Sequence, residues 1–221
     1  MNSKLEIYKM TLNNMASDKR MKGPNIKAVL FDFDGTLTLP GALDFPAIKR
    51  ELDCPLNMPI LEFLETVPAG QREPLLVILE AREEEAACQS IPNQGAEECL
   101  LKLKQKGLLL GILTRNSLKS VCGALKQFSH VRETDFDVII TRDDCLPKPD
   151  PDGVLKAARI MGIKPDELMV VGDFRFDIMA GHAAGSYTVL LTNGAKSVMA
   201  PGDPEPDHIM DDLSKFIEIL I

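Results

Sequence analysis

Short apolar runs with strand character alternate with stretches of helical periodicity along most of this sequence, from Ile26 onward. Strand-like runs occupy residues 27–33, 108–114, 136–141, 168–172 and 187–191, with a further short segment at 208–210. Helices are predicted over residues 96–106, 117–128, 151–161, 174–184 and 213–220. Parallel strands need long crossover connections, usually helices, so this alternation indicates βαβ units. The sequence therefore predicts an α/β fold, a Rossmann-like doubly wound parallel sheet with helices on both faces.

One long stretch, residues 41–93, interrupts the alternation because it contains no strand pattern. It shows three helical pieces instead, at 44–52, 59–67 and 73–88, each with a proline near its expected start, where the ring is tolerated. The stretch is predicted to be a small all-helical cap inserted after the first strand. The expected organisation is therefore an N-terminal extension, a split core and a cap, comprising residues 1–25, 26–40 with 94–221, and 41–93.

Composition and charge exclude several classes of protein. The net charge of −8 without a basic stripe argues against nucleic acid as a partner. The longest apolar runs, such as 108–113, are too short to span a bilayer, so no membrane partner is expected. Five cysteines without a CxxC pair favour free thiols in a reducing compartment. We expect a cytoplasmic monomer or weak dimer.

The N-terminal extension, residues 1–25, has five basic and two acidic side chains and no apolar stretch typical of a secretory signal. Organelle targeting by this segment is an alternative to a cytoplasmic location. The simpler interpretation is an extension that packs on the body or frays.

The most informative motif, Asp32-Phe33-Asp34-Gly35-Thr36-Leu37-Thr38, lies at the end of the first predicted strand. Reactive sites in open α/β sheets lie at the carboxyl ends of strands. Because the strand ends here and Gly35 permits a tight turn, the two carboxylates are free to point in different directions.

Polar side chains also follow the later strands. Thr114-Arg115-Asn116 follows the second, where a hydroxyl and free N–H groups at a helix start suit an anion. Lys148 follows the third, between two prolines, and Asp173 and Asp177 follow the fourth. Each feature alone has an ordinary explanation, namely a helix cap, a solvated lysine and acids at a helix start.

Together these residues indicate a functional site more strongly than any of them does alone. If the first and fourth strands are neighbours, four aspartates crowd one pocket and repel one another unless cations intervene. Lys148 supplies one positive charge, and a hard divalent ion with oxygen ligands supplies more. Without a His or Cys cluster, Mg²⁺ suits the site better than Zn²⁺. A nucleophilic Asp, an acid/base Asp, Mg²⁺, a Lys and a hydroxyl suit phosphoryl transfer through an aspartyl-phosphate.

The four motifs, taken in order, resemble those of the haloacid dehalogenase-like hydrolases. Among these, the chain is similar to the phosphatases with a helical cap after the first motif, such as phosphoglycolate phosphatase. The resemblance covers residues 27 to about 193, with the cap. It implies Mg²⁺-dependent hydrolysis of a small phosphorylated metabolite, a phosphate monoester. The family's true dehalogenases lack the second aspartate of the first motif, so Asp34 favours phosphate esters as substrates.

The resemblance also implies residue roles. Asp32 would be the nucleophile and Asp34 the general acid/base, while Thr114 and Lys148 would bind phosphoryl oxygens. Asp173 would ligate Mg²⁺ with the Asp32 carboxylate and the backbone carbonyl of Asp34, and Asp177 would support the metal. The expected metal residues are thus Asp32, Asp34, Asp173 and Asp177.

Substrate contacts are expected from the loops beside these residues, at Gly35, Thr36, Arg115 and Asn116. Arg115 departs from the family pattern, in which a small polar residue is frequent, and is either an extra phosphate contact or solvated. Cap cations are weaker candidates: Lys49, Arg50, Arg72 and Arg82. The short cap predicts a loosely covered site and activity on several small esters. Two alternatives use the same fold: a phosphomutase of the β-phosphoglucomutase type, and a non-catalytic binding or regulatory protein.

Overall fold

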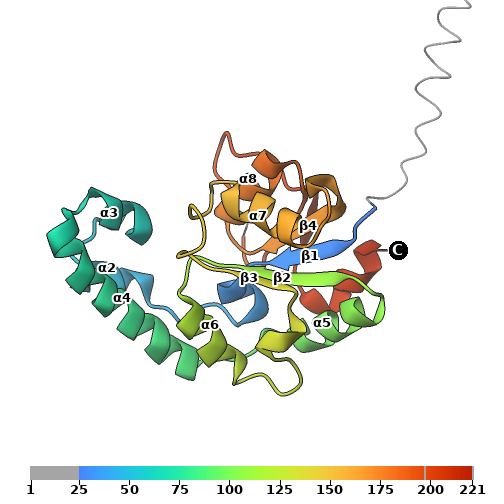
Figure 1. Cartoon of the computed structure of the whole chain (residues 1–221), viewed down its shortest axis with the longest axis horizontal. Helices are drawn as coiled ribbons and strands as arrows, with labels where there is room; N and C mark the ends of the chain where they lie inside the picture. The colour runs from blue at the N-terminus through green and yellow to red at the C-terminus, as the bar shows by residue number, and fades with distance from the viewer. Residues whose placement is uncertain (1–24, 197, 221) are drawn as a thin grey trace, which may run out of the picture.

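A six-stranded parallel sheet forms the centre of the molecule in the computed structural model, which describes residues 25–196 and 198–220 (Figure 1). The strand order is β3-β2-β1-β4-β5-β6, and every neighbouring pair is parallel. The predicted α/β fold is therefore confirmed, and the first and fourth strands are neighbours, which is the condition for the aspartates to share one pocket. The strands are β1 (Ala28–Phe31), β2 (Leu109–Leu113), β3 (Val138–Ile140), β4 (Leu168–Gly172), β5 (Tyr187–Leu191) and β6 (His208–Met210).

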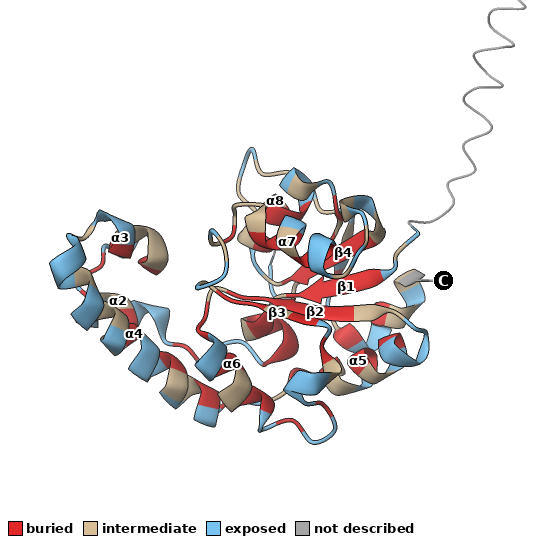
Figure 2. Ribbon diagram, viewed as in Figure 1, coloured by how far each residue is buried: buried red, intermediate tan, exposed pale blue. Residues whose placement is uncertain are grey.

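Helices cover both faces of the sheet, α7 and α8 on one side and α5 and α6 on the other (Figure 1). Successive strand residues alternate between the two cores, so Val29 and Phe31 face α5 and α6 while Ala28 and Leu30 face α7 and α8. Figure 2 shows the strands as buried almost throughout. The helices are α2 (Phe45–Glu51), α3 (Ile60–Thr66), α4 (Ala69–Cys88), α5 (Ala96–Gln105), α6 (Leu118–Leu125), α7 (Asp152–Ile160) and α8 (Arg175–Ala184).

Several element boundaries differ from those that the sequence predicts. The last predicted helix is a 3₁₀-helix, η4 (Leu213–Leu220), and the short 3₁₀ turns η2 (Glu133–Asp135) and η3 (Pro165–Glu167) were not anticipated. Helix α7 begins at Asp152, although the Asp150 carboxylate still accepts the Asp152 N–H at 2.9 Å. Of the predicted N-terminal extension, only Asn25 lies within the described residues. No helix in the described part of the chain is both long and apolar enough to cross a membrane.

The inserted stretch forms helices α2, α3 and α4, which share a small apolar cluster separate from the sheet. Its buried members are Leu43, Ile48, Leu52, Cys54, Ile60, Leu64 and Leu79. Helix α4 begins at Ala69, earlier than predicted, so Pro74 lies inside it. Only the first four N–H groups of a helix lack intrahelical partners, so Pro74, the sixth residue of α4, removes one hydrogen bond from the second turn of the helix.

Helix α4 also connects the cap to the core. Its Glu83 side chain is only 3% exposed and pairs with the Arg142 guanidinium, 6% exposed, at 2.5 Å. The Glu83 carboxylate accepts the Ser117 N–H at 3.3 Å, and the Glu83 carbonyl accepts the Ser120 hydroxyl at 3.3 Å. Four residues further on, Ala87 belongs to the core cluster beneath the sheet. One face of the C-terminal part of α4, at Glu83 and Ala87, is therefore packed against the core.

The two connections between cap and core also pair with each other. The Leu39 N–H donates to the Ile91 carbonyl at 2.8 Å, and the Asn93 N–H donates to the Leu37 carbonyl at 2.9 Å. An antiparallel bridge at Thr38 and Pro92 lies between these two bonds. Both entry points of the cap are thus fixed at the end of the motif loop.

We predict that Glu83→Ala destabilises the protein by about 3 kcal/mol, because it leaves the buried Arg142 charge with only the half-exposed Glu80 carboxylate, 3.5 Å away, as a partner. The change is measured as the free energy of unfolding in urea. Glu51→Ala is the matched control, since Glu51 pairs with Arg82, the neighbour of Glu83, on the exposed face of the cap. A destabilisation by Glu83→Ala no larger than that of the control would contradict the anchoring role of α4.

Candidate active site

The first motif follows β1 directly and lies beside the end of β4. Phe31 and Val171 are register partners, and the Asp32 N–H donates to the Val171 carbonyl at 2.8 Å. Gly35 has a φ of +79°, and a Cβ there would lie 2.1 Å from the Asp173 carboxylate oxygen. Only glycine combines this left-handed turn with so close an approach. The turn therefore brings the Asp32 and Asp173 loops together, as the sequence predicts.

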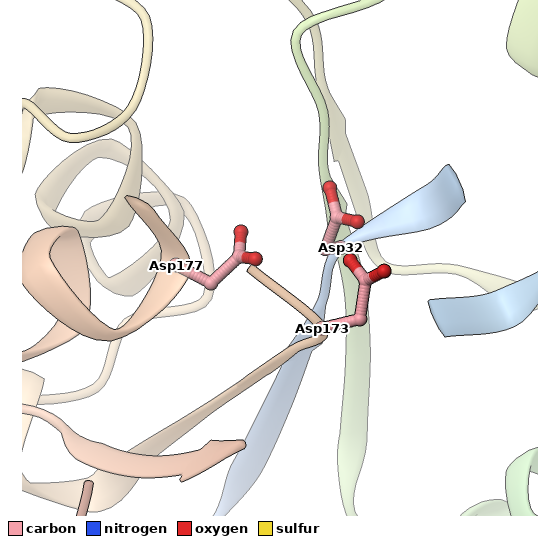
Figure 3. Close-up of side chains that lie close together, drawn as sticks. All are labelled: Asp32, Asp173 and Asp177. Atoms are coloured by element: carbon pink, nitrogen blue, oxygen red, sulfur yellow. The ribbon is translucent and has the colours of Figure 1, made fainter. Parts of the chain in front are cut away.

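Three carboxylates converge at this edge of the sheet (Figure 3). Asp32 comes from the end of β1, Asp173 from the end of β4 and Asp177 from the first turn of α8. One carboxylate oxygen from each lies within 4.8 Å of those of the other two. The cluster supplies only oxygen donors, the ligand type that hard divalent ions such as Mg²⁺ prefer. These three residues fit a metal ion of that kind.

The Lys148 ammonium lies against the cluster and is buried. Its Nζ donates to the Asp32 carboxylate at 2.5 Å, to the Asp177 carboxylate at 2.6 Å and to the Leu113 carbonyl at 2.8 Å. An ammonium has three donors, so all of them are used. Lys148 is therefore a fixed positive charge between two aspartates, not the solvated lysine that its local sequence alone would suggest.

The site carries more negative than positive charge, and the pKa values reflect this imbalance. Burial raises the pKa of Asp173 to about 8, and the neighbouring Asp32 and Asp177 charges add to this effect. Burial also raises the pKa of Asp177 to about 6, although Lys148 opposes the rise. Burial alone would lower the pKa of Lys148, but Asp177 and Asp32 raise it above its usual value. A bound cation would relieve the repulsion among the carboxylates.

Asp34 has different surroundings from the three-carboxylate cluster. Its Oδ2 accepts a hydrogen bond from the Asn116 side-chain amide at 2.5 Å. Burial and the Asp32 charge raise the pKa of Asp34 to about 7, while the Asn116 bond opposes this rise. The carboxyl group of Asp34 is thus suited to exchange a proton near neutral pH. The two carboxylates of the motif are therefore suited to two different roles.

The remaining predicted site residues lie around this pair. The Thr114 hydroxyl accepts the Asn116 N–H at 3.1 Å. Gly35 and Thr36 are buried beneath the site, and their carbonyls accept from Asn193 at 2.7 Å and from Asn93 at 2.9 Å, respectively. Neither of them borders the cavity, although both were expected to contact substrate.

Arg115 borders the cavity, and its side chain is only 21% exposed and is paired with a residue of the cap, so it is not simply solvated. A contact between Arg115 and the substrate stays a prediction. The Arg115 guanidinium forms a bidentate ion pair with Glu62 of cap helix α3, at 2.9 and 2.5 Å. It also donates to the Lys148 carbonyl and lies over the Phe176 ring, 5.2 Å from its centre. The Glu62 carboxylate, which the sequence does not single out, binds the Arg115 guanidinium and so connects the cap to the core.

A cavity of about 710 Å³ opens between the sheet edge that carries the aspartates and the cap. Its polar lining includes Asp32, Asp34, Lys49, Asn57, Glu83, Thr114, Arg115, Asn116, Lys148, Asp173, Arg175 and Asp177. Among the candidate cap cations only Lys49 borders this space. Arg72 pairs with Glu65 and Arg82 with Glu51, so these two arginines belong to exposed ion pairs.

The sequence does not single out four polar residues that hold parts of the site in place: Asn93, Asn193, Glu62 and Glu83. The two asparagines meet through a 3.0 Å hydrogen bond although they are 100 positions apart in the chain. Glu62 and Glu83 lie on helices where an acidic side chain is normally solvated. No local pattern distinguishes such residues, because their partners come from distant segments.

Comparison with known proteins agrees with this geometry. The family model for haloacid dehalogenase-like hydrolases matches residues 26–185. Uncharacterized hydrolase YOR131C of Saccharomyces cerevisiae is 34% identical over 199 residues, which cover 89% of this chain and 91% of that protein. Pyrophosphatase PpaX of Bacillus velezensis is 29% identical over 214 residues, covering 90% and 98% respectively.

The fold is also similar to solved structures. A crystal structure of a predicted phosphoglycolate phosphatase from Haemophilus somnus matches with a TM-score of 0.71 and 22% identity, over 89% of this chain and 99% of that one. Together with the arrangement of Asp32, Asp34, Lys148 and Asp173, these similarities show that the chain belongs to the haloacid dehalogenase-like hydrolases.

Proposed function

We propose that the protein hydrolyses small phosphate monoesters with the help of Mg²⁺, through an aspartyl-phosphate intermediate. The observation that carries the proposal is the different environment of the two motif aspartates. Asp32 is fixed by the Lys148 ammonium at 2.5 Å, whereas Asp34 borders the same cavity with its pKa raised to about 7. A nucleophile and a proton donor are thus available on one loop.

In the proposed reaction, a carboxylate oxygen of Asp32 attacks phosphorus and the bond from phosphorus to the ester oxygen breaks. The Asp34 carboxyl group gives its proton to the leaving oxygen. A water molecule then attacks the phosphorus of the aspartyl-phosphate and loses its proton to Asp34. Inorganic phosphate leaves, and both carboxyl groups return to their starting states.

Positive groups at the site favour the anionic substrate. Lys148 and Thr114 border the cavity. The Thr114 hydroxyl is suited to donate to a phosphoryl oxygen, and the Lys148 ammonium would attract the phosphoryl group by its charge and would bind it by exchanging one of its present acceptors. Asp32, Asp173 and the Asp34 carbonyl would hold Mg²⁺, with Asp177 in support. Bound there, the ion would neutralise charge on the phosphoryl group. The names of similar proteins, a pyrophosphatase and a predicted phosphoglycolate phosphatase, support a phosphate compound as the substrate.

We predict that Asp32→Asn lowers kcat for phosphate ester hydrolysis by about three orders of magnitude or more, because it removes the attacking charge. Phosphate release is the measurement, and Asp166→Asn, an exposed substitution on η3, is the control. An unchanged melting temperature would show that the variant is folded. Retention of more than about a tenth of wild-type turnover would rule out Asp32 as the nucleophile.

Asp34→Asn tests proton donation separately. An alkyl leaving group needs a proton as it departs, whereas p-nitrophenolate needs little help. We therefore expect the substitution to reduce kcat/KM, which covers only the steps up to formation of the aspartyl-phosphate, by a larger factor for ethyl phosphate than for p-nitrophenyl phosphate. Equal losses in kcat/KM with the two esters would contradict proton donation by Asp34 to the leaving group.

Metal binding is tested by thermal unfolding as well as by activity. A ligand that binds the folded state raises the melting temperature, so Mg²⁺ added after EDTA treatment should raise it for the wild-type protein. Asp173→Asn should abolish most of this rise, and Asp166→Asn should preserve it. A wild-type enzyme that works equally well in EDTA would contradict the metal requirement.

A further inference from the structure

Two of the nine phenylalanines are largely exposed, and both border the catalytic cavity. Phe45, the first residue of cap helix α2, is 50% exposed, and Phe174, just before α8, is 43% exposed. An exposed phenylalanine loses the free energy that burial of its ring would provide. Such residues gathered at one cavity suggest a ligand that covers them.

The core side of this aromatic surface is held in place. Phe174 and Phe176 meet edge to face, with ring centres 5.0 Å apart. The Arg115 guanidinium lies over Phe176, and Glu62 fixes that guanidinium from the cap. The rings are therefore supported by an ion pair between cap and core, and one wall of the cavity is preorganised.

The cap side is apolar as well. Besides Phe45, the cap contributes Pro59, Ile60, Leu61 and Leu79 to the lining. The volume of about 710 Å³ lies within the usual range for ligands larger than a phosphate group. The cavity thus has a charged end at the sheet and an apolar part that extends toward the cap.

We propose that this apolar part is a subsite for an aromatic ring on the leaving group of the phosphate ester. The subsite consists of Phe45, Phe174 and Phe176. This inference rests on the proposed phosphatase function and specifies its substrate class: a phosphate monoester whose alcohol carries a phenyl-type or nucleobase ring. The phosphoryl group lies at Asp32, and the ring packs between the core and cap phenylalanines.

Charge favours a ring over a second anionic group. Apart from the catalytic lysine, the cavity is bordered by three cations, and two of them are already neutralised. Arg115 pairs with Glu62 at 2.5 Å, and Arg175 pairs with Asp203 at 2.5 Å. The third is Lys49 of the cap, whose ammonium donates to a backbone carbonyl at 2.8 Å. Among residues 25–196 and 198–220, only this cation borders the cavity without a carboxylate partner and is therefore placed to attract a second negative group on the substrate.

Two matched pairs of esters test the proposal. Ethyl and 2-phenylethyl phosphate have similar leaving groups and differ by a phenyl ring, and ribose 5-phosphate and adenosine 5′-monophosphate differ by a base. We expect kcat/KM to be at least about tenfold higher for the ring-bearing ester in at least one pair, the scale of one ring stacked on an aromatic side chain.

Substitutions assign the effect to the subsite. Phe174→Ala and Phe45→Ala should each reduce the ratio of kcat/KM between the two members of the preferred pair. Leu155→Ala is the control, because Leu155 is 40% exposed on α7 and does not border the cavity. It should leave the ratio unchanged. A ratio that is equally insensitive to all three substitutions would overturn the assignment.

Binding of phosphonates separates this inference from the proposed function. Calorimetry with Mg²⁺ compares ethylphosphonate with 2-phenylethylphosphonate, whose C–P bonds resist hydrolysis, and we expect the latter to bind at least about tenfold more tightly.

Equal affinities and equal kcat/KM values within both pairs would overturn the subsite while leaving phosphatase activity intact. Phosphoglycolate differs from ethyl phosphate by a carboxylate. If this carboxylate raised kcat/KM by a larger factor than the aromatic ring does, the result would overturn the aromatic subsite in favour of an anion subsite at Lys49. Failure to hydrolyse any ester would contradict the proposed function itself.

Discussion

The contact between the Lys148 ammonium and the carboxylates of Asp32 and Asp177 is the interaction on which the site depends. Buried charges are costly unless they are paired and their hydrogen bonds are satisfied. Lys148 meets both conditions, because its three donors reach two carboxylates and the Leu113 carbonyl. The parallel order of β3, β2, β1 and β4 brings these groups together, because Lys148 follows β3 and the Leu113 carbonyl belongs to β2. The sheet therefore supplies the geometry, and Lys148 makes the crowding of the aspartates tolerable.

The cap is connected to the core at two places, one along helix α4 and one beside Lys148. Helix α4 places Leu79 in the cap cluster and Ala87 in the core cluster, with the buried Glu83 between them. Nearer the aspartates, Glu62 pairs with Arg115, whose guanidinium also donates to the backbone carbonyl of Lys148. The cap and the Lys148 backbone thus share one arginine. Cap and core both line the cavity, so in the proposed reaction the position of the cap would affect the alignment of the substrate.

Sequence reasoning predicted the parallel sheet and the four motifs because strand periodicity and strand-end residues are local signals. The structure brings Asp32, Lys148, Asp173 and Asp177 together as expected. It also shows an ion pair that the sequence does not predict, between Arg115 and Glu62 of the cap, which lie 53 positions apart and share no local pattern. For the same reason, the sequence does not predict the roles of Asn93 and Asn193, which bind the motif loop, or of Glu83, which connects α4 to the core. Residues whose function depends on a distant partner require coordinates, whereas residues fixed by their own strand end do not.

The central claim is that Asp32 carries the phosphoryl group during turnover. Acid quenching during steady-state hydrolysis, followed by borohydride reduction and peptide mass spectrometry, measures this directly, because reduction converts an aspartyl-phosphate into homoserine. The account predicts homoserine at position 32 in the wild-type protein, and none without substrate. Modification at another residue, or turnover with no modified aspartate under conditions that trap a reference acyl phosphate, would contradict it.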